Sequence, residues 1–174
     1  MLLAGEEWAA RFVGFRREAW RLEPLPQYLM PQEAEEFQAF RGGARIDPAA
    51  VSDEYTDRLR RQVAEGRSQG RVHVLTRPLS DYLLFEFHRY YKAHSLAGEQ
   101  IRILDVTDRP NPLEGVQDFW MFDSAEVVLM NYRPDGRQIS REVFDGDVAP
   151  FLEYQRIALD GSVSFEEYVK GIDL

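Results

Sequence analysis

The sequence predicts an α/β fold: a single domain with a mixed β-sheet, a strand-helix-strand core unit and helices at both chain ends. Two observations carry this prediction. Between residues 71 and 106, a strand pattern, a helix pattern and a second strand pattern follow with short connections, which is typical of parallel strands joined by a helical crossover. Two further strand patterns flank the turn Pro134-Asp135-Gly136 and predict an antiparallel hairpin.

Residues 1–66 are predicted to be mainly helical. A helix over 6–22 is indicated by apolar residues at three- and four-residue spacing, namely Trp8, Phe12, Phe15, Ala19 and Leu22. Prolines then punctuate an extended segment, and Pro31 is suited to open a short helix that ends at Gly42-Gly43. Ser52 or Asp53 is a suitable N-cap for a further helix that runs to about Glu65.

Residues 71–144 are predicted to form the α/β core. The apolar run that begins at Val72 indicates a strand ending before Pro78, and Ser80 is a good N-cap for a helix that runs to about Leu96. Alternating residues over 101–106 indicate the next strand. Further strands are expected at 118–123, 127–132 and 139–144.

Residues 147–174 are predicted to be helical. Asp147 is suited to cap a helix that is broken at Gly161. Ser164 and Glu167 form a capping-box pattern that opens a last helix over 165–170. These elements complete a single domain over 1–174.

Composition and charge limit the classes of protein that the chain can belong to. The 174 residues are 44% hydrophobic, and the absence of cysteine excludes disulfides and thiolate metal sites. The net charge of −9 disfavours a nucleic-acid-coating protein, because phosphate binding needs concentrated positive charge. No apolar stretch is long enough to span a membrane, and the N-terminus lacks the basic region of a signal peptide. We therefore expect a cytoplasmic protein without a metal or cofactor.

Histidines and carboxylates form no clear catalytic or metal-binding pattern. His88 and His94 are six residues apart on one predicted helix and therefore cannot act as an i, i+4 metal pair. Asp118 and Asp123 are five apart on a predicted strand and point to opposite faces, which weakens a paired acid–base role. We expect such carboxylates to mark strand ends or to accept hydrogen bonds from nearby backbone donors.

The junction of the first core strand and its helix is a candidate ligand site. Arg77 and Ser80 lie where a strand meets a helix N-terminus, and free backbone N–H groups there attract anions. A phosphate-bearing ligand at the 77–81 turn, helped by His88, Arg102 or Asp123, would make the protein an enzyme or a small-ligand binder. The other interpretation is a capped helix beside a solvated arginine.

Five arginines also gather within one short segment: Arg58, Arg60, Arg61, Arg67 and Arg71. We interpret them as the solvated face of a helix followed by a loop, since most charge runs are solvated. A nucleic-acid-binding module would need these arginines on one exposed face.

A family resemblance is carried by five segments: REAWRLE, RVHVLTRPLSDYLLFEF, GEQIRIL, DFWMFD and VVLMNY. They resemble a small actinobacterial family of unknown function, over roughly Trp8 to Leu159. Members are often encoded beside helix-turn-helix regulators, which implies a regulatory partnership.

A weaker likeness is to one half of the phospholipase D fold. The catalytic pattern of that superfamily is His-x-Lys with a later Asp, but the corresponding region here reads Asp118-Phe119-Trp120, and only Asp123 matches. The likeness therefore implies a catalytically degenerate or reused site, and no catalytic residue is carried over.

These observations favour a non-enzymatic regulatory protein that acts through a protein partner, for which the resemblance suggests a helix-turn-helix regulator. The expected contact surface combines helix 6–22 with the aromatic 118–123 strand, and its candidate residues are Trp8, Phe12, Phe15 and Trp120. If all four are buried, they belong to the core instead. The alternative function is recognition of a phosphate-bearing ligand at the 77–81 turn.

Overall fold

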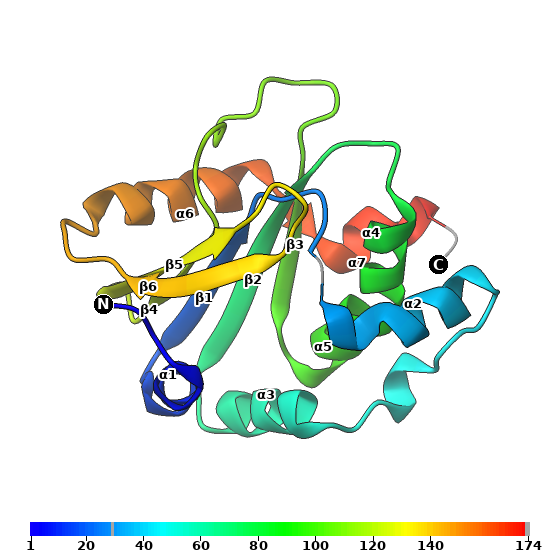
Figure 1. Cartoon of the computed structure of the whole chain (residues 1–174), viewed down its shortest axis with the longest axis horizontal. Helices are drawn as coiled ribbons and strands as arrows, with labels where there is room; N and C mark the ends of the chain where they lie inside the picture. Colours follow the sequence, from blue (N-terminus) through cyan, green and yellow to red (C-terminus); the bar gives the residue numbers. More distant parts are fainter. Residues whose placement is uncertain (29, 173–174) are drawn as a thin grey trace.

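One mixed β-sheet organises the chain, in the strand order β6-β5-β4-β1-β2-β3-β7 (Figure 1). The computed structural model describes residues 1–28 and 30–172. The strands are β1 (Glu18–Glu23), β2 (Ser68–Leu75), β3 (Gln100–Asp105), β4 (Phe119–Phe122), β5 (Glu126–Tyr132), β6 (Gln138–Val143) and β7 (Val163–Ser164). β1, β2 and β3 are mutually parallel, whereas β4, β5, β6 and β7 join as antiparallel neighbours. The predicted mixed α/β fold is confirmed.

Helices cover both faces of this sheet (Figure 1). The α-helices are α1 (Gly5–Gly14), α2 (Ala34–Arg41), α3 (Glu54–Ala64), α4 (Asp81–Glu86), α5 (Lys92–Ala97), α6 (Ala149–Gly161) and α7 (Phe165–Tyr168). The π-helical η3 (Phe87–Tyr91) joins α4 to α5, and the short 3₁₀ helices are η1 (Pro31–Glu33), η2 (Pro48–Ala50) and η4 (Val169–Gly171). In the part of the chain that the structure describes, no helix combines the length and apolarity needed to cross a bilayer.

Local signals confirm several predicted boundaries. The Oγ of Ser80 accepts a hydrogen bond from the N–H of Leu83 at the start of α4, and Ser164 caps α7 in the same way. Asp53 caps α3, and Gly98 adopts the left-handed conformation that ends α5. β5 and β6 pair as the predicted hairpin.

The expected helix over 6–22 is wrong in its second half. α1 ends at Gly14, and residues 18–23 form β1, which pairs with β2 and β4 in the middle of the sheet. The carboxylate of Asp123 fixes the corner between α1 and β1 by accepting hydrogen bonds from three successive backbone N–H groups, those of Arg16, Arg17 and Glu18. Both faces of β1 are buried, so its sequence lacks the alternation that marks a half-exposed strand.

The two faces of the central strands differ in chemistry. One face carries Trp20 and Leu22 of β1 and Val72 and Val74 of β2, which pack in an apolar core against α6. The opposite face carries the alternate residues of the same strands, including Arg21, Glu23, Arg71 and His73. Apolar clusters under α1 and beside η3 flank this buried polar row.

Candidate functional site

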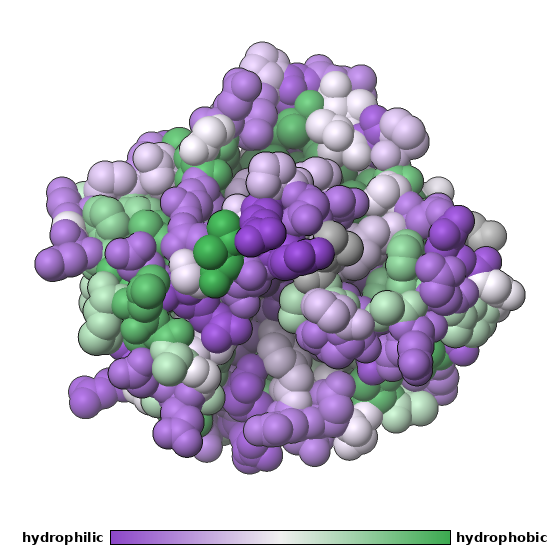
Figure 2. Space-filling view, in the orientation of Figure 1, coloured by the Kyte–Doolittle hydropathy of each residue, from purple (hydrophilic) through white to green (hydrophobic). Residues whose placement is uncertain are grey.

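A cavity of about 470 Å³ lies above the polar row of the sheet. It opens near the middle of the face shown in Figure 2. Its walls come from α1, α3, the α4–η3–α5 segment and the β5–β6 hairpin, together with Tyr28, Met30 and Glu33. Aromatic rings dominate the lining, namely Trp8, Phe12, Tyr28, Tyr55, Tyr82, Tyr90, Tyr91, Trp120 and Tyr132. Its charged residues are Arg21, Arg58, Arg71 and Arg141 with Glu23, Glu33 and Glu86.

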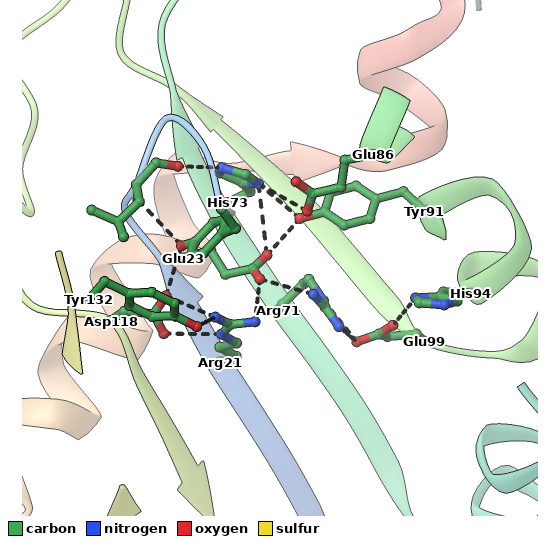
Figure 3. Close-up of polar contacts among 12 residues, drawn as sticks. Arg21, Glu23, Arg71, His73, Glu86, Tyr91, His94, Glu99, Asp118 and Tyr132 are labelled. Atoms are coloured by element: carbon green, nitrogen blue, oxygen red, sulfur yellow. Dashed lines mark hydrogen bonds and ion pairs between the residues drawn. The ribbon is translucent and has the colours of Figure 1, made fainter. Parts of the chain in front are cut away.

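A row of alternating charges runs along the sheet, and its central members, Arg21, Glu23 and Arg71, form the floor of the cavity (Figure 3). The Oε1 of Glu23 lies 2.5 Å from Nη1 of Arg21 and 3.0 Å from Nη1 of Arg71. Arg21 forms a two-bond pair with Asp118, at 3.0 Å for each bond. Arg71 donates from Nε and Nη2 to one oxygen of Glu99, Oε1, at 2.9 and 2.7 Å. The row is set by strand register, because Arg21 and Arg71 are direct neighbours across β1 and β2.

Neighbouring charges decide which floor carboxylates are ionised. Burial opposes ionisation of Glu23, yet Arg21 and Arg71 hold its pKa well below the ordinary value. Burial also opposes ionisation of Glu99, but Arg71 and then His94 lower its pKa to about 2. Glu86 behaves in the opposite way, because burial and the negative charge of Glu23 raise its pKa to about 8. At neutral pH Glu86 is therefore mainly a neutral carboxylic acid.

His73 and Tyr91 connect Glu23 to Glu86 (Figure 3). Nε2 of His73 lies 3.0 Å from the carbonyl oxygen of Leu25, and Nδ1 lies 2.8 Å from the hydroxyl of Tyr91. That hydroxyl donates to Oε2 of Glu23 at 2.6 Å. Burial lowers the pKa of His73, although Glu23 opposes this shift.

One atom each from Glu23, His73 and Glu86 lies within 4.8 Å of the other two, a spacing that a metal ion would tolerate. The hydrogen bonds argue against this use. Both ring nitrogens of His73 already have partners, and Glu23 is paired with two guanidinium groups that would repel a cation. The cluster is better suited to hold a proton.

Two arginines on the walls differ from those on the floor. The guanidinium carbon of Arg58 lies 5.0 Å from the ring centre of Phe12, and that of Arg141 lies 5.1 Å from Trp8. The two rings form an edge-to-face pair with centres 4.8 Å apart. Within residues 1–28 and 30–172, neither guanidinium has a carboxylate partner, and Nε of each is buried without a hydrogen bond. Among the arginines that line the cavity, these two have no acidic partner in the described part of the chain.

The structure does not assemble the predicted ligand residues at the 77–81 turn. Arg77 is exposed and pairs with Asp105 and Asp108, and Ser80 serves as the helix cap. Arg102 donates to Ser162 at the edge of β7, and Asp123 holds the α1–β1 corner. They occupy three separate regions, and none of the four lines the cavity.

His88 also lies outside the cavity lining, where its Nε2 accepts the backbone N–H of Ile46. The arginines of 58–71 do not share one exposed face either. Arg58 and Arg71 line the cavity, and Arg67 donates to the carbonyl oxygens of Val13 and Phe15.

The aromatic residues of the predicted contact surface are mostly buried. Phe12, Phe15 and Trp120 are buried, and Trp8 is half-buried against them, because β4 and α1 pack their aromatic faces together. Trp8, Phe12 and Trp120 instead form one wall of the cavity. Sequence reasoning missed Arg21, Glu23, Arg141 and Glu86. The sequence did contain a signal for this row. Arg21 and Glu23 are two residues apart in EAWRLE, and the polar residues Arg71 and His73 have the same spacing in β2.

Comparisons with known proteins give a family but no activity. No curated protein matches the chain. Among solved structures, TrmBL2, described as an archaeal chromatin protein with a novel mode of DNA binding, matches with 11% identity and a TM-score of 0.47. The match covers 91% of this chain and 48% of TrmBL2, so the chain spans about half the length of that protein. The family model described as a domain of unknown function, DUF6879, matches residues 6–170, and the chain therefore belongs to this family.

Proposed function

We propose that this protein is a non-catalytic binding module whose cavity takes up a small organic anion that carries a ring. The observation that carries the proposal is the excess of arginine around the cavity. Four arginines face three glutamates there, in a chain with a net charge of −9. Glu86 is mainly neutral at pH 7, so the lining is more positive than this count indicates. Such a field favours an anionic occupant.

Unused hydrogen-bond donors support the same conclusion. Arg58 has no hydrogen-bond acceptor within the described ranges, and Nε of Arg141 has none either. On the floor, Nη1 of Arg21 and Nη1 of Arg71 each carry two hydrogens, and both atoms share the single acceptor Oε1 of Glu23. A ligand that supplies acceptor oxygens would satisfy donors that the protein itself does not.

The size and the lining of the cavity indicate the rest of the ligand. A volume of about 470 Å³ falls within the range of pockets for small molecules. Aromatic side chains offer flat faces that stack on a ring. Glu23, Glu99 and Asp118 are each paired with arginine or tyrosine side chains, so they form a fixed binding surface and are not free to act as a nucleophile or general base.

A fluorescent anion tests the proposal directly. The probe is 8-anilinonaphthalene-1-sulfonate, which combines aromatic rings with a sulfonate that stays ionised at every working pH. We expect saturable binding of one probe per chain, at least tenfold weaker in Arg58→Gln and in Arg141→Gln. The matched control is Arg61→Gln, an exposed arginine on the same helix α3, which should bind as the wild type does.

A neutral probe separates charge from apolar burial. N-phenyl-1-naphthylamine has the same rings without the sulfonate, and we expect it to bind more weakly and to be insensitive to Arg58→Gln. Equal binding of both probes by all variants would contradict the proposal. If the sulfonate probe binds as expected, competitors can displace it. The competitors to compare are nucleoside monophosphates, sugar phosphates and aromatic carboxylates, and the most effective class indicates the chemistry of the natural ligand.

Regulation through a protein partner remains a separate prediction that rests on the family resemblance. In this view, an actinobacterial, cytoplasmic protein with a degenerate phospholipase D-like fold would report ligand occupancy to a helix-turn-helix regulator. Affinity capture with and without the displacing ligand tests it. Recovery of such a regulator in a ligand-dependent amount would support the prediction, and its absence under both conditions would contradict it.

A further inference from the structure

Glu86 is the one floor carboxyl whose contacts leave an oxygen unused. The residue is 5% exposed and lines the cavity, yet its Oε2 is buried without a hydrogen-bond partner among the described residues. Its Oε1 lies 3.9 Å from Nδ1 of His73, beyond hydrogen-bond distance. A buried ionised carboxylate with a bare oxygen is unfavourable, whereas a neutral carboxylic acid needs fewer donors.

The hydroxyl of Tyr91 cannot serve all of its neighbours. It carries one hydrogen, and two acceptors already compete for it, Oε2 of Glu23 at 2.6 Å and Nδ1 of neutral His73 at 2.8 Å. Glu86 also lies beside this hydroxyl. Since Tyr91 has no second hydrogen to give, an ionised Glu86 would lack a donor there, whereas a protonated Glu86 can itself donate.

We propose that Glu86 holds a proton in the floor of the cavity and that the organic anion is bound while this carboxyl is neutral. The inference rests on the proposed function and adds its regulation by pH. Ionisation of Glu86 would place a second negative charge beside Glu23, in the cavity that must receive the anion. The ligand and this charge repel each other, so each disfavours the other.

The charged groups around Glu86 come from three elements. Glu23 and Arg21 belong to β1, His73 and Arg71 to β2, and Tyr82 and Tyr91 to the α4–η3 segment. The arginine pKa values are raised, and burial raises the pKa of both tyrosines far above 10. The pKa of His73 is lowered. Of these groups, Glu86, with a pKa of about 8, is the one that titrates between pH 7 and 9.

The affinity for 8-anilinonaphthalene-1-sulfonate between pH 6 and 9.5 tests the coupling. In the wild type we expect a nearly constant Kd up to pH 7 and an increase of about tenfold between pH 7 and 9, since the binding form is lost through the pKa of Glu86. Glu86→Gln imitates the neutral acid and should bind with a Kd that does not change over this range.

Glu33→Gln is the matched control, because Glu33 also lines the cavity and burial also raises its pKa. This variant should keep the pH profile of the wild type. A flat profile in Glu33→Gln with a normal profile in Glu86→Gln would overturn the assignment to Glu86. Binding by the wild type that is independent of pH would overturn the coupling alone. Failure of the probe to bind at any pH would overturn the proposed function as well.

Stability provides a readout without any ligand. The folded state raises the pKa of Glu86 above that of the unfolded chain, so its neutral form is stabilising at low pH and this contribution is lost as pH rises to about 8. The denaturation midpoint of Glu86→Gln should therefore rise relative to that of the wild type from pH 5 to 8 and then stay level. A constant difference over that range would show that Glu86 is already ionised and would overturn the proposal.

Discussion

Two arginines, Arg71 and Arg77, lie between acidic side chains in nearly the same geometry but in different surroundings. Arg71 lies 3.0 Å from Glu23 and 2.7 Å from Glu99, and Arg77 lies 2.7 Å from Asp105 and 2.9 Å from Asp108. The Arg71 side chain is 9% exposed and the Arg77 side chain is 52% exposed. The ion-pair distances of the two arginines are therefore nearly equal. The exposed fraction of the side chain is what distinguishes the buried site from the surface pair.

Burial changes what each arginine does. At the 77–81 turn, water solvates and screens the ions, so the contacts of Arg77 add little stability, although Ser80 lines a second cavity of about 520 Å³. On the cavity floor, the ions have lost their water, and every donor or acceptor must find a partner in the protein or in a bound molecule. The spare Nη1 hydrogens of Arg21 and Arg71 thus matter in the cavity, whereas spare hydrogens of Arg77 are satisfied by solvent.

The largest expected effect that follows from this comparison is that of Arg71→Met. The variant leaves the buried carboxylates of Glu23 and Glu99 without their shared cation, and we expect the free energy of unfolding to fall by about 3–5 kcal/mol. Urea denaturation at pH 7 measures it, with Arg61→Met as the exposed control. A loss below about 1 kcal/mol would show that the floor pairs resemble surface pairs.

Tyr91→Phe should have a smaller effect on the same floor. The variant keeps the ring and removes the hydroxyl that donates to Glu23 at 2.6 Å, so we expect a loss of about 1.5–3 kcal/mol, as for a hydrogen bond to a charged group. Tyr154→Phe is the control, because this half-buried tyrosine of α6 has no hydrogen bond in residues 1–28 and 30–172. Equal midpoints for the two variants in urea denaturation would contradict the role of the Tyr91 hydroxyl.

The same comparison explains what the sequence can and cannot predict. The helix cap at Ser80, the hairpin turn at Pro134 and the strand before Pro78 are recognisable because each signal is local. The floor depends on register between strands far apart in the chain: Glu23 and Arg71 are 48 residues apart, and they meet because β1 lies beside β2. The pattern of β1 predicts a helix, because a short run buried on both faces has no period that distinguishes a strand from a helix. Local sequence signals therefore could not predict which residues of separate elements line one cavity.

The smallest expected effect is that of Arg77→Ala. Burial opposes ionisation of Asp105, but the side chain and N–H of Thr107, the hydroxyl of Tyr168 and Arg77 lower its pKa to about 2. Loss of Arg77 leaves three of these four donors in place, so the urea midpoint at pH 7 should not change measurably. Binding of 8-anilinonaphthalene-1-sulfonate should also equal that of the wild type, because Arg77 does not line the cavity.

This variant decides between the two ligand sites that the chain offers. Weaker binding in Arg77→Ala, with unchanged binding in Arg58→Gln, would move the anion from the cavity to the 77–81 turn. The cavity is favoured because the acids beside Arg77 already neutralise it, whereas Arg58 and Arg141 have aromatic neighbours and no acid. In an acidic protein, an arginine left without an acid beside a cavity is a stronger sign of an anionic ligand than one that stands at a helix N-terminus.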